Sequence, residues 1–314
     1  MDQEGFHWFR KEWENRMRDK EEGKGPGPRR PPEDDIEEIE IEPVPVSIQS
    51  IESLREGYSW IHALETRYPG WHLQSVEGFP FALPAKKLSE SKVCLISLAG
   101  VYRKGQKPFS TSPGMVPAPL RAMRIKDRGD WSFREISLDA ESTDLAVAHA
   151  HYDTREAEED INCIFPMIRL VELEVEGVIG ACAEVHYGLM GFVPEVQLLV
   201  RTAAGEIVSR LKAQQVDAAV VCGGCELSHQ SAALIQREIE AAGIPTVGVS
   251  VCPDVTERLH VPRAVALRFP LGSPFGMSMD VSMQLRVLRD ALSLIDTAKA
   301  PGPVVHLPYE WVKA

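Results

Sequence analysis

The sequence has no hydrophobic run long enough to cross a membrane. Its amino-terminus, MDQEGFHWFRKEWENR, lacks the basic and then apolar order of a secretory signal. The 34 Lys and Arg residues are outnumbered by 46 Asp and Glu residues, which gives a formal net charge of −12. A chain of that charge lacks the basic footprint with which proteins bind nucleic-acid phosphates. We therefore expect a soluble, cytoplasmic protein whose partners include neither a membrane nor a nucleic acid.

Cysteine is also scarce, and its spacing excludes a disulfide framework. Six cysteines are spread irregularly over 314 residues, whereas domains stabilised by disulfides are small and dense in cysteine. Four of the six stand in apolar or strand-like surroundings, where a buried free thiol is the ordinary interpretation. Only Cys222 and Cys225 stand close together, in the stretch VVCGGCELSHQ.

Polar and apolar patterning divides the chain into three parts. Residues 1–47 combine charge blocks, prolines and glycines, and such a composition buries too little apolar surface to offset the entropy lost on ordering. This part is predicted to be a disordered acidic arm, although a short amphipathic helix near its start could bind a partner. Two α/β lobes are expected to follow, comprising residues 48–205 and residues 206–314.

Within the globular part, apolar runs and helical periodicity alternate. Strands are predicted at residues 92–100, 131–139, 177–185, 216–221 and 244–251, and helices at residues 47–68, 165–177, 191–215 and 228–242. The order of strand, CGGC turn, helix and strand in residues 216–251 is a βαβ unit, which implies parallel pairing with a right-handed crossover. The expected fold is α/β, with a doubly wound, Rossmann-like parallel sheet whose ligands bind beyond the carboxyl ends of the strands.

The CGGC turn places two thiols where a strand ends and a helix begins. Backbone donors and the dipole at a helix N-terminus favour a thiolate, and Gly223 and Gly224 let the backbone fold tightly enough to bring both sulfurs within bonding range. Cys222 is then the expected nucleophile, and Cys225 the thiol that resolves a mixed disulfide. His229 could assist by proton transfer, although a His in a first helical turn is as often a solvated polar residue.

Metal binding is the alternative interpretation of the same cysteines. A CxxC pair can form half of a zinc site, but the chain has no second CxxC, so a four-ligand site needs distant residues such as His149, His151 or His186. Zinc or another divalent ion held by Cys222, Cys225 and members of the group His149, His151 and Asp153 would indicate a metal-dependent lyase or a desulfurase-like enzyme. A third hypothesis is a non-catalytic subunit whose N-terminal arm recruits a partner.

Three polar residues alternate in the stretch AHAHYD. An extended backbone would present His149, His151 and Asp153 on one side, toward one ion or one substrate. His151 is also a candidate for the proton transfer considered for His229. A surface loop without a function is the competing interpretation.

Other polar residues follow predicted strands and are candidates for contacts with a substrate. Arg103 and Lys107 come after the strand at residues 92–100 and could hold a carboxylate or phosphate group. Basic loops are, however, usually only solvated. Glu184 and His186 lie at the end of the strand at residues 177–185, where they could act as an acid and a base.

The same residues resemble a known family. CGGC, a helix ending in REIEAAGIPTV and the segment VSVCPDVTERLHVPRAVALRFPLGSPFG are similar to the C-terminal part of component B of the glycine, sarcosine, betaine and D-proline reductases. In that family a selenocysteine-x-x-Cys motif precedes the helix, and Cys222 stands at the selenocysteine position with Cys225 as its partner. The resemblance extends over about residues 92–276, and its later segment is matched at Arg263, Pro270, Leu271, Gly272 and Pro274.

The resemblance implies an oxidoreductase whose thiol or selenol attacks carbon in a C–N or related bond of a small, polar substrate. A dithiol or thioredoxin-like electron donor would restore the thiols, and a companion subunit or a homo-oligomer is an expected partner. Members of the family work beside a second subunit that carries a pyruvoyl group, so this cofactor is expected on a partner and not on this chain. A sulfur nucleophile is less ionised at neutral pH than selenium and leaves less readily, so the substrate stays open.

Overall fold

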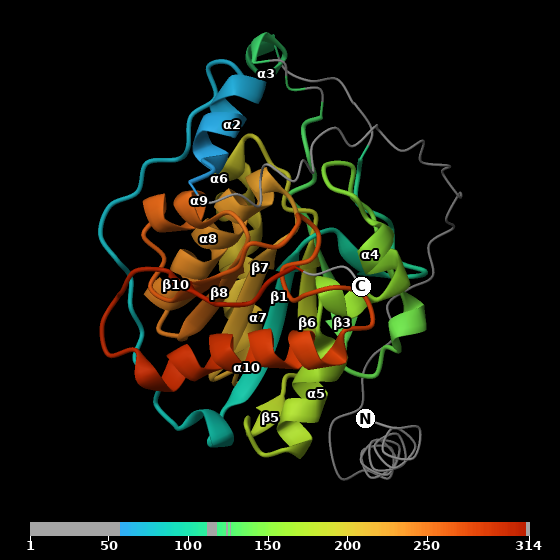
Figure 1. Ribbon diagram of the computed structural model, residues 1–314, viewed down its shortest axis with the longest axis vertical. Coiled ribbons are helices and arrows are strands. Elements are labelled where there is room, and N and C mark those ends of the chain that lie inside the picture. The colour runs from blue at the N-terminus through green and yellow to red at the C-terminus, as the bar shows by residue number, and fades with distance from the viewer. Residues whose placement is uncertain (1–56, 112–117, 124, 126, 312–314) are drawn as a thin grey trace. The chain divides into compact units, whose positions relative to one another are not determined.

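The computed structural model describes residues 57–111, 118–123, 125 and 127–311, and Figure 1 shows how they are arranged. The centre is an eight-stranded sheet in the order β10-β9-β8-β7-β1-β6-β3, with β5 pairing on β1. Its strands are β1 (Lys92–Leu98), β3 (Phe133–Ser137), β5 (Ala181–Cys182), β6 (Val185–Leu189), β7 (Ala218–Gly223), β8 (Thr246–Ser250), β9 (Ala264–Ala266) and β10 (Val305–His306). Every pair in this sheet is parallel except β3 with β6, so the predicted α/β fold is confirmed.

Helices cover both faces of this sheet, and others lie beyond it. The helices are α2 (Trp60–Arg67), α3 (Ala118–Ala122), α4 (Arg155–Glu159), α5 (Met167–Val175), α6 (Val196–Leu199), α7 (Gly205–Ala213), α8 (Glu226–Ala241), α9 (Pro253–Arg258) and α10 (Val281–Thr297). α8 packs on β7 and β8 and contacts α7 and α9, whereas α10 packs on α5 and crosses in front of the sheet in Figure 1. None of the helices in the described part of the chain is long and apolar enough to cross a membrane.

The two central strands explain why the sheet is covered on both faces. β7 is buried along its whole length, and β1 is buried at every residue but the first. A strand buried on both faces reads as a continuous apolar run, as KVCLISL and AAVVCG do. The βαβ unit predicted at residues 216–251 is therefore present as β7, α8 and β8, with β7 and β8 parallel.

One predicted strand differs from the structure, and a histidine accounts for the difference. Residues 177–185 were expected to form one strand, but the chain instead forms β5 and then β6, both on β1. Between these two pairings, His186 Nδ1 accepts a hydrogen bond from Leu95 N at 2.9 Å. The side chain thus takes the backbone donor that a continuous ladder would have used.

Other predicted boundaries shift by smaller amounts. The helix expected at residues 191–215 begins at Val196 and contains a π-helical turn, Val200–Ala204. The first predicted lobe contributes β1, β3, β5 and β6 to the large sheet, and the second contributes β7 to β10. The two sets of strands meet where β1 pairs with β7. The division into lobes stays a prediction, and the predicted arm, residues 1–47, lies outside the described residues.

A smaller antiparallel sheet continues from the end of β1. It consists of β2 (Val101–Arg103) and β4 (Leu145–Val147). Gly100 precedes β2 with a positive φ of 83°, and a Cβ there would lie 2.4 Å from Ala148 O. Glycine at this position therefore lets the chain turn tightly from the large sheet into the small one, so that residues 148–153 reach the carboxyl edge of the large sheet.

Candidate functional site

The two cysteines of the CGGC turn lie at the carboxyl edge of the central sheet. Cys222 belongs to the end of β7, where it pairs with Ser97 of β1 and Val249 of β8. Cys225 is the N-cap residue of α8. Their exposed fractions are 3% and 0%. The predicted position is therefore correct, but both thiols are enclosed by protein.

The glycines between the cysteines are required because other groups approach them closely. A Cβ on Gly223 would lie 2.9 Å from Ser228 Oγ, and a Cβ on Gly224 would lie 2.7 Å from Tyr152 Cε1 and 2.7 Å from Ala99 Cβ. Any side chain at these two positions would displace the start of α8 or the Tyr152 ring. The CGGC spacing thus follows from packing around the turn.

Each thiol has a hydrogen-bond partner. Cys222 Sγ donates to Ile164 O at 3.3 Å. Cys225 Sγ accepts from Ser228 N at 3.3 Å, while Cys225 N donates to Ser228 Oγ at 2.7 Å, so the two residues cap α8 reciprocally. The sequence contains this signal as C-x-x-S, but sequence reasoning did not use it.

Burial decides the charge of both thiols. It raises the pKa of Cys222 to about 12, although the neighbouring polar groups of Ser97 and Leu98 oppose the rise. It raises the pKa of Cys225 to about 12 as well, with a further rise from the Glu226 charge, and the contacts with Ser228 oppose it. The thiols are thus neutral at pH 7 in this arrangement, because loss of solvent outweighs the helix N-terminus that was expected to favour a thiolate.

His229 joins the start of α8 to the end of β8. Because a carbonyl only accepts, Nδ1 must donate to Cys225 O, at 2.7 Å. Nε2 then accepts from Val251 N at 3.1 Å. Burial lowers the pKa of His229 to about 4, so the ring is neutral and both of its nitrogens bind backbone. This geometry gives His229 a positioning role, and its part in proton transfer stays a prediction.

The AHAHYD stretch also reaches this edge of the sheet. His151 Nε2 lies 3.1 Å from Asp127 Oδ2, and its ring stacks on Phe192 with centroids 3.4 Å apart. His149 Nδ1 accepts from His151 N at 3.0 Å, and its ring centroid is 4.6 Å from that of Tyr152. Tyr152 touches the CGGC turn and His149 packs on Tyr152, whereas His151 contacts His149, Phe192 and Asp127.

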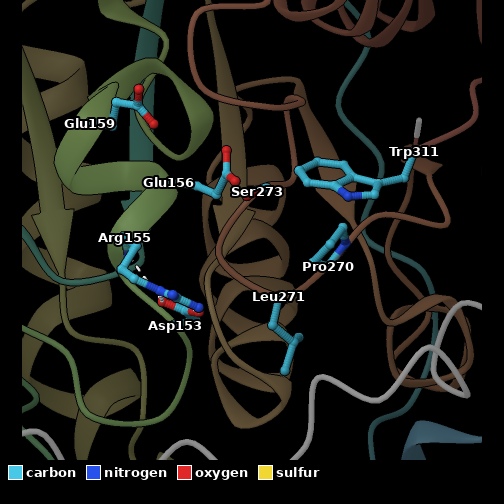
Figure 2. Close-up of a pocket in the computed structure, with 8 residues that line it drawn as sticks. All are labelled: Asp153, Arg155, Glu156, Glu159, Pro270, Leu271, Ser273 and Trp311. Carbon is cyan, nitrogen blue, oxygen red and sulfur yellow. Dashed lines mark hydrogen bonds and ion pairs between the residues drawn. The ribbon is translucent and has the colours of Figure 1, made fainter. Parts of the chain in front are cut away.

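Asp153 points toward a pocket. Its carboxylate accepts from Arg155 Nε at 2.9 Å. Figure 2 shows the pocket, which has a volume of about 290 Å³ and lies between α4 and the segment after β9. Its lining residues are Asp153, Arg155, Glu156, Glu159, Pro270, Leu271, Ser273 and Trp311. Pro270 and Leu271 belong to the segment on which the family resemblance rests.

The basic and acidic candidates lie elsewhere. Arg103 Nη2 is 3.2 Å from Asp144 Oδ2, and the backbone oxygen of Lys107 accepts from Arg134 Nε at 2.7 Å. In the described part of the chain, no hydrogen bond or ion pair joins Arg103 or Lys107 to the CGGC turn. Their contacts with a substrate stay predictions.

Glu184 lies at the amino edge of the large sheet, opposite the CGGC turn, and His186 lies within the sheet. Glu184 Oε1 is 3.2 Å from Nζ of Lys92, the first residue of β1, so it lies at the amino edge. His186 is fully buried within β6, and burial lowers its pKa to about 3. The structure does not bring either residue to the thiols, and their acid and base roles also stay predictions.

The metal hypothesis needs three or four ligands in one place. Across the residues that the structure describes, no three His, Cys, Asp or Glu side chains gather in a way that could hold an ion. Cys222 and Cys225 each use the thiol in a protein contact, and His149 faces Tyr152 and His151. The metal ligands proposed from the sequence stay a prediction, and the described residues do not form a metal site in advance.

Sequence reasoning missed a partly buried ion pair beside Cys225. Glu226, the first residue of α8, is 3% exposed and pairs through Oε1 with Arg67 Nη1 at the end of α2. α2 is held in place because Asp254 Oδ2 accepts from Ser59 Oγ and Ile61 N, at 2.9 and 3.0 Å. No local pattern could have found a pair separated by 159 residues.

Comparison with known proteins shows the family of the chain. The sequence profile of the family described as Glycine/sarcosine/betaine reductase selenoprotein B (GRDB) matches residues 63–223, which include β1, β6 and β7 with Cys222. The chain belongs to this family. The reductase family inferred from CGGC and the later segment is thereby confirmed.

Similar proteins are named as subunits of reductases. The chain is 34% identical to the D-proline reductase subunit gamma of Acetoanaerobium sticklandii over 227 residues, or 72% of this chain and 87% of that protein. It is 28% identical to the glycine reductase complex component B subunit gamma of Symbiobacterium thermophilum, over 74% of this chain and 52% of that protein. It is 31% identical to the betaine reductase complex component B subunit beta of Peptoclostridium acidaminophilum, over 68% and 46%. No solved structure matches the chain significantly.

These matches differ in how much of each relative they cover. The chain spans most of the D-proline reductase subunit but about half of the glycine and betaine reductase subunits. The named relatives support a reductase-related role in a complex.

Proposed function

We propose that the chain is a subunit of a reductase complex and carries its reactive dithiol, Cys222 and Cys225. The reaction is the reductive cleavage of a C–N or related bond in a small, polar substrate. The observation that supports this proposal is the placement of CGGC, at the carboxyl end of β7 with Cys225 capping α8, in a member of this reductase family. Ligands of doubly wound sheets bind at this edge.

The proposed chemistry balances with one external dithiol. Cys222 sulfur attacks the substrate carbon, the C–N bond breaks, and the thiol proton goes to the leaving nitrogen. Cys225 sulfur then attacks the sulfur of the Cys222 thioether, which forms a disulfide and leaves the carbon to take the Cys225 proton. A dithiol or thioredoxin-like donor reduces the disulfide with two electrons and two protons.

The histidines differ in how well they suit proton transfer in this scheme. Both ring nitrogens of His229 bind backbone groups, so His229 would have to leave its position to exchange a proton. His151 has a carboxylate partner in Asp127 and directly precedes Tyr152, whose ring packs on the turn. We assign the proton-transfer role to His151 and the positioning role to His229.

Companion subunits complete the proposal. The relatives named above are subunits of complexes, and the pyruvoyl group that the family uses for the substrate amine is assigned to a partner. Buried thiols with a pKa near 12 are poor nucleophiles, so the resting site has to open or lose a proton when substrate arrives. This requirement agrees with a subunit that acts only within its complex.

The test measures turnover in cysteine variants and the thioether that one of them should retain. The complex purified through the full chain is supplied with dithiothreitol and, in turn, D-proline, glycine, sarcosine and betaine, and product is followed by mass spectrometry. Cys222→Ser is expected to abolish turnover, Cys225→Ser to stop it after one thioether per chain, and Cys182→Ala, a matched buried cysteine at another site, to leave it unchanged. Full activity in Cys222→Ser would refute the assignment.

A further inference from the structure

A buried aromatic ring packs against the CGGC turn. Tyr152 is 1% exposed, and its hydroxyl donates to Ala99 O at 2.7 Å. Its ring lies between two glycines, because a Cβ on Gly224 would come within 2.7 Å of Cε1, and a Cβ on Gly272 within 2.3 Å of Cδ2. No other residue type at these two positions leaves space for the ring.

The second glycine belongs to a segment that covers the turn. Gly272 has a positive φ of 82°, and Gly272 N donates to Gly224 O at 2.8 Å. The backbone of Gly272 thus lies against the CGGC turn and against Tyr152 together. This contact connects the two stretches of sequence on which the family resemblance rests, CGGC and PLGSP.

The pocket in Figure 2 is lined by sequence neighbours of the two residues that form this closure. They are Asp153, which follows Tyr152 in the chain, and Leu271 and Ser273, which flank Gly272. A molecule in the pocket therefore contacts residues adjacent to both Tyr152 and Gly272. Movement of the Tyr152 ring or of the Gly272 backbone would connect the pocket with the CGGC turn.

The charges of the pocket indicate what it admits. Three carboxylates, those of Asp153, Glu156 and Glu159, line it with a single cation, Arg155. Trp311 adds an aromatic face, and such faces attract ammonium groups. The surplus of negative charge favours a positively charged amine over an anion.

We propose that this pocket is the entrance through which a small amine reaches Cys222 and Cys225, and that the Tyr152 ring, held between Gly224 and Gly272, is the gate. The inference rests on the proposed function, because it assigns an access route to the same thiols. It also explains how a dithiol enclosed by protein serves an external substrate. The rest of the site need not move.

The gate is tested with thiol reagents on the full chain. The modification of each cysteine by iodoacetamide is timed by peptide mass spectrometry. Tyr152→Ala and Gly272→Ala are expected to speed modification of Cys222 and Cys225 about tenfold or more. Gly177→Ala is the control, because Gly177 also has a positive φ, of 74°, but its Cβ would meet no atom within 4 Å. Unchanged rates in both gate variants would overturn the gate.

A fully buried cysteine reports whether the variants stay folded. Cys94 lies in β1 with an exposed fraction of 0%, so it reacts only when the sheet opens. Selective modification of the CGGC thiols with Cys94 protected supports the gate. If Cys94 reacts as fast as the CGGC thiols in the alanine variants, Tyr152→Phe decides the question. This variant keeps the ring but loses the bond to Ala99 O, and an unchanged rate in it would then overturn the gate.

The entrance is tested with a pair of reagents that differ in charge. Methanethiosulfonates bearing a trimethylammonium or a sulfonate group are compared on Tyr152→Ala, and the cation is expected to react faster. Adding Glu156→Gln and Glu159→Gln should reduce this preference by a factor on the order of ten, whereas Glu184→Gln, at the opposite edge of the sheet, should leave it unchanged. An unaltered preference in the double Gln variant would place the entrance elsewhere.

The outcomes separate this inference from the proposed function. Reagent access does not require turnover, so the gate can hold even if the Cys222→Ser complex keeps its activity. Conversely, the complex can lose activity in Cys222→Ser while Tyr152→Ala leaves access unchanged. In that case the dithiol function stands and the route through this pocket is wrong.

Discussion

The buried ion pair between Arg263 and Glu240 offers a quantitative test of how the family segment is held. Both side chains are 0% exposed, and Arg263 Nη1 lies 2.8 Å from Glu240 Oε1. Arg263 Nη2 also donates to Ala82 O at 2.7 Å, and the guanidinium lies 3.9 Å from the centroid of the Phe81 ring. Arg263 is thus expected to stabilise the fold and not to bind substrate.

Replacing Arg263 with Met leaves the Glu240 carboxylate buried without its cation. Glu240 keeps hydrogen bonds from Ala82 N and Thr246 N, each at 2.6 Å, and these bonds limit the loss of unfolding free energy. Removal of one partner from a buried pair costs about 3–5 kcal/mol of unfolding free energy. The expected loss for Arg263→Met is therefore about 3–5 kcal/mol.

A second substitution separates the charge from the packing. Glu240→Gln, added to Arg263→Met, removes the uncompensated charge and keeps one of the two oxygens that accept from Ala82 N and Thr246 N, so it should restore about 1–3 kcal/mol. Urea unfolding followed by tryptophan fluorescence measures all variants. Arg289→Met is the control, because its partner Glu176 is 47% exposed and the pair should contribute about 0–1 kcal/mol. A loss below about 1 kcal/mol for Arg263→Met, or no recovery in the double variant, would refute the reasoning.

Two further predictions follow from the turn. The folded pKa of His229, about 4, lies below the ordinary value near 6.5, so the unfolded chain binds more protons between these pH values. Stability should therefore fall by up to about 3 kcal/mol as pH drops from about 6.5 to 4. His229→Gln should make the unfolding free energy, measured by urea unfolding, depend less steeply on pH in this range, while His186 retains a similar contribution. An equally steep pH dependence in this variant would contradict the lowered pKa of His229. Gly224→Ala should cost about 1–3 kcal/mol through overpacking against Ala99 and Tyr152. Gly205→Ala, in α7 with no atom within 4 Å of its Cβ, should instead raise the stability by about 0.5–1 kcal/mol. If thermal unfolding shows stability changes of the same sign in the two variants, this would count against the packing argument.

Local patterns predicted the elements around the thiols well. The apolar run before CGGC and the helical periodicity after it are confirmed as β7 and α8. These elements follow from periodicity over a few residues, which survives in almost any tertiary context. The strand expected at residues 177–185 was wrong in its extent, because the partner of His186 Nδ1 is a backbone amide on β1, a contact that no local pattern encodes.

The charge state of the site shows the limit of local reasoning. A helix N-terminus was expected to favour a thiolate, and Cys225 does cap α8. The pKa of its thiol is nevertheless raised to about 12, since the side chain is buried beside Glu226. Burial depends on α2, the AHAHYD stretch and the segment after β9 all reaching the same edge of the sheet.

By itself the sequence determined the α/β class, the βαβ unit that carries CGGC and the reductase family, because each rests on residues adjacent in the chain. Only the tertiary structure decided that the thiols are enclosed and neutral, that His229 binds backbone on both sides, and that Tyr152 lies between Gly224 and Gly272. These features arise from contacts between residues far apart in sequence. Their energies depend on burial and close approach, which are set when the sheet brings its strand ends together.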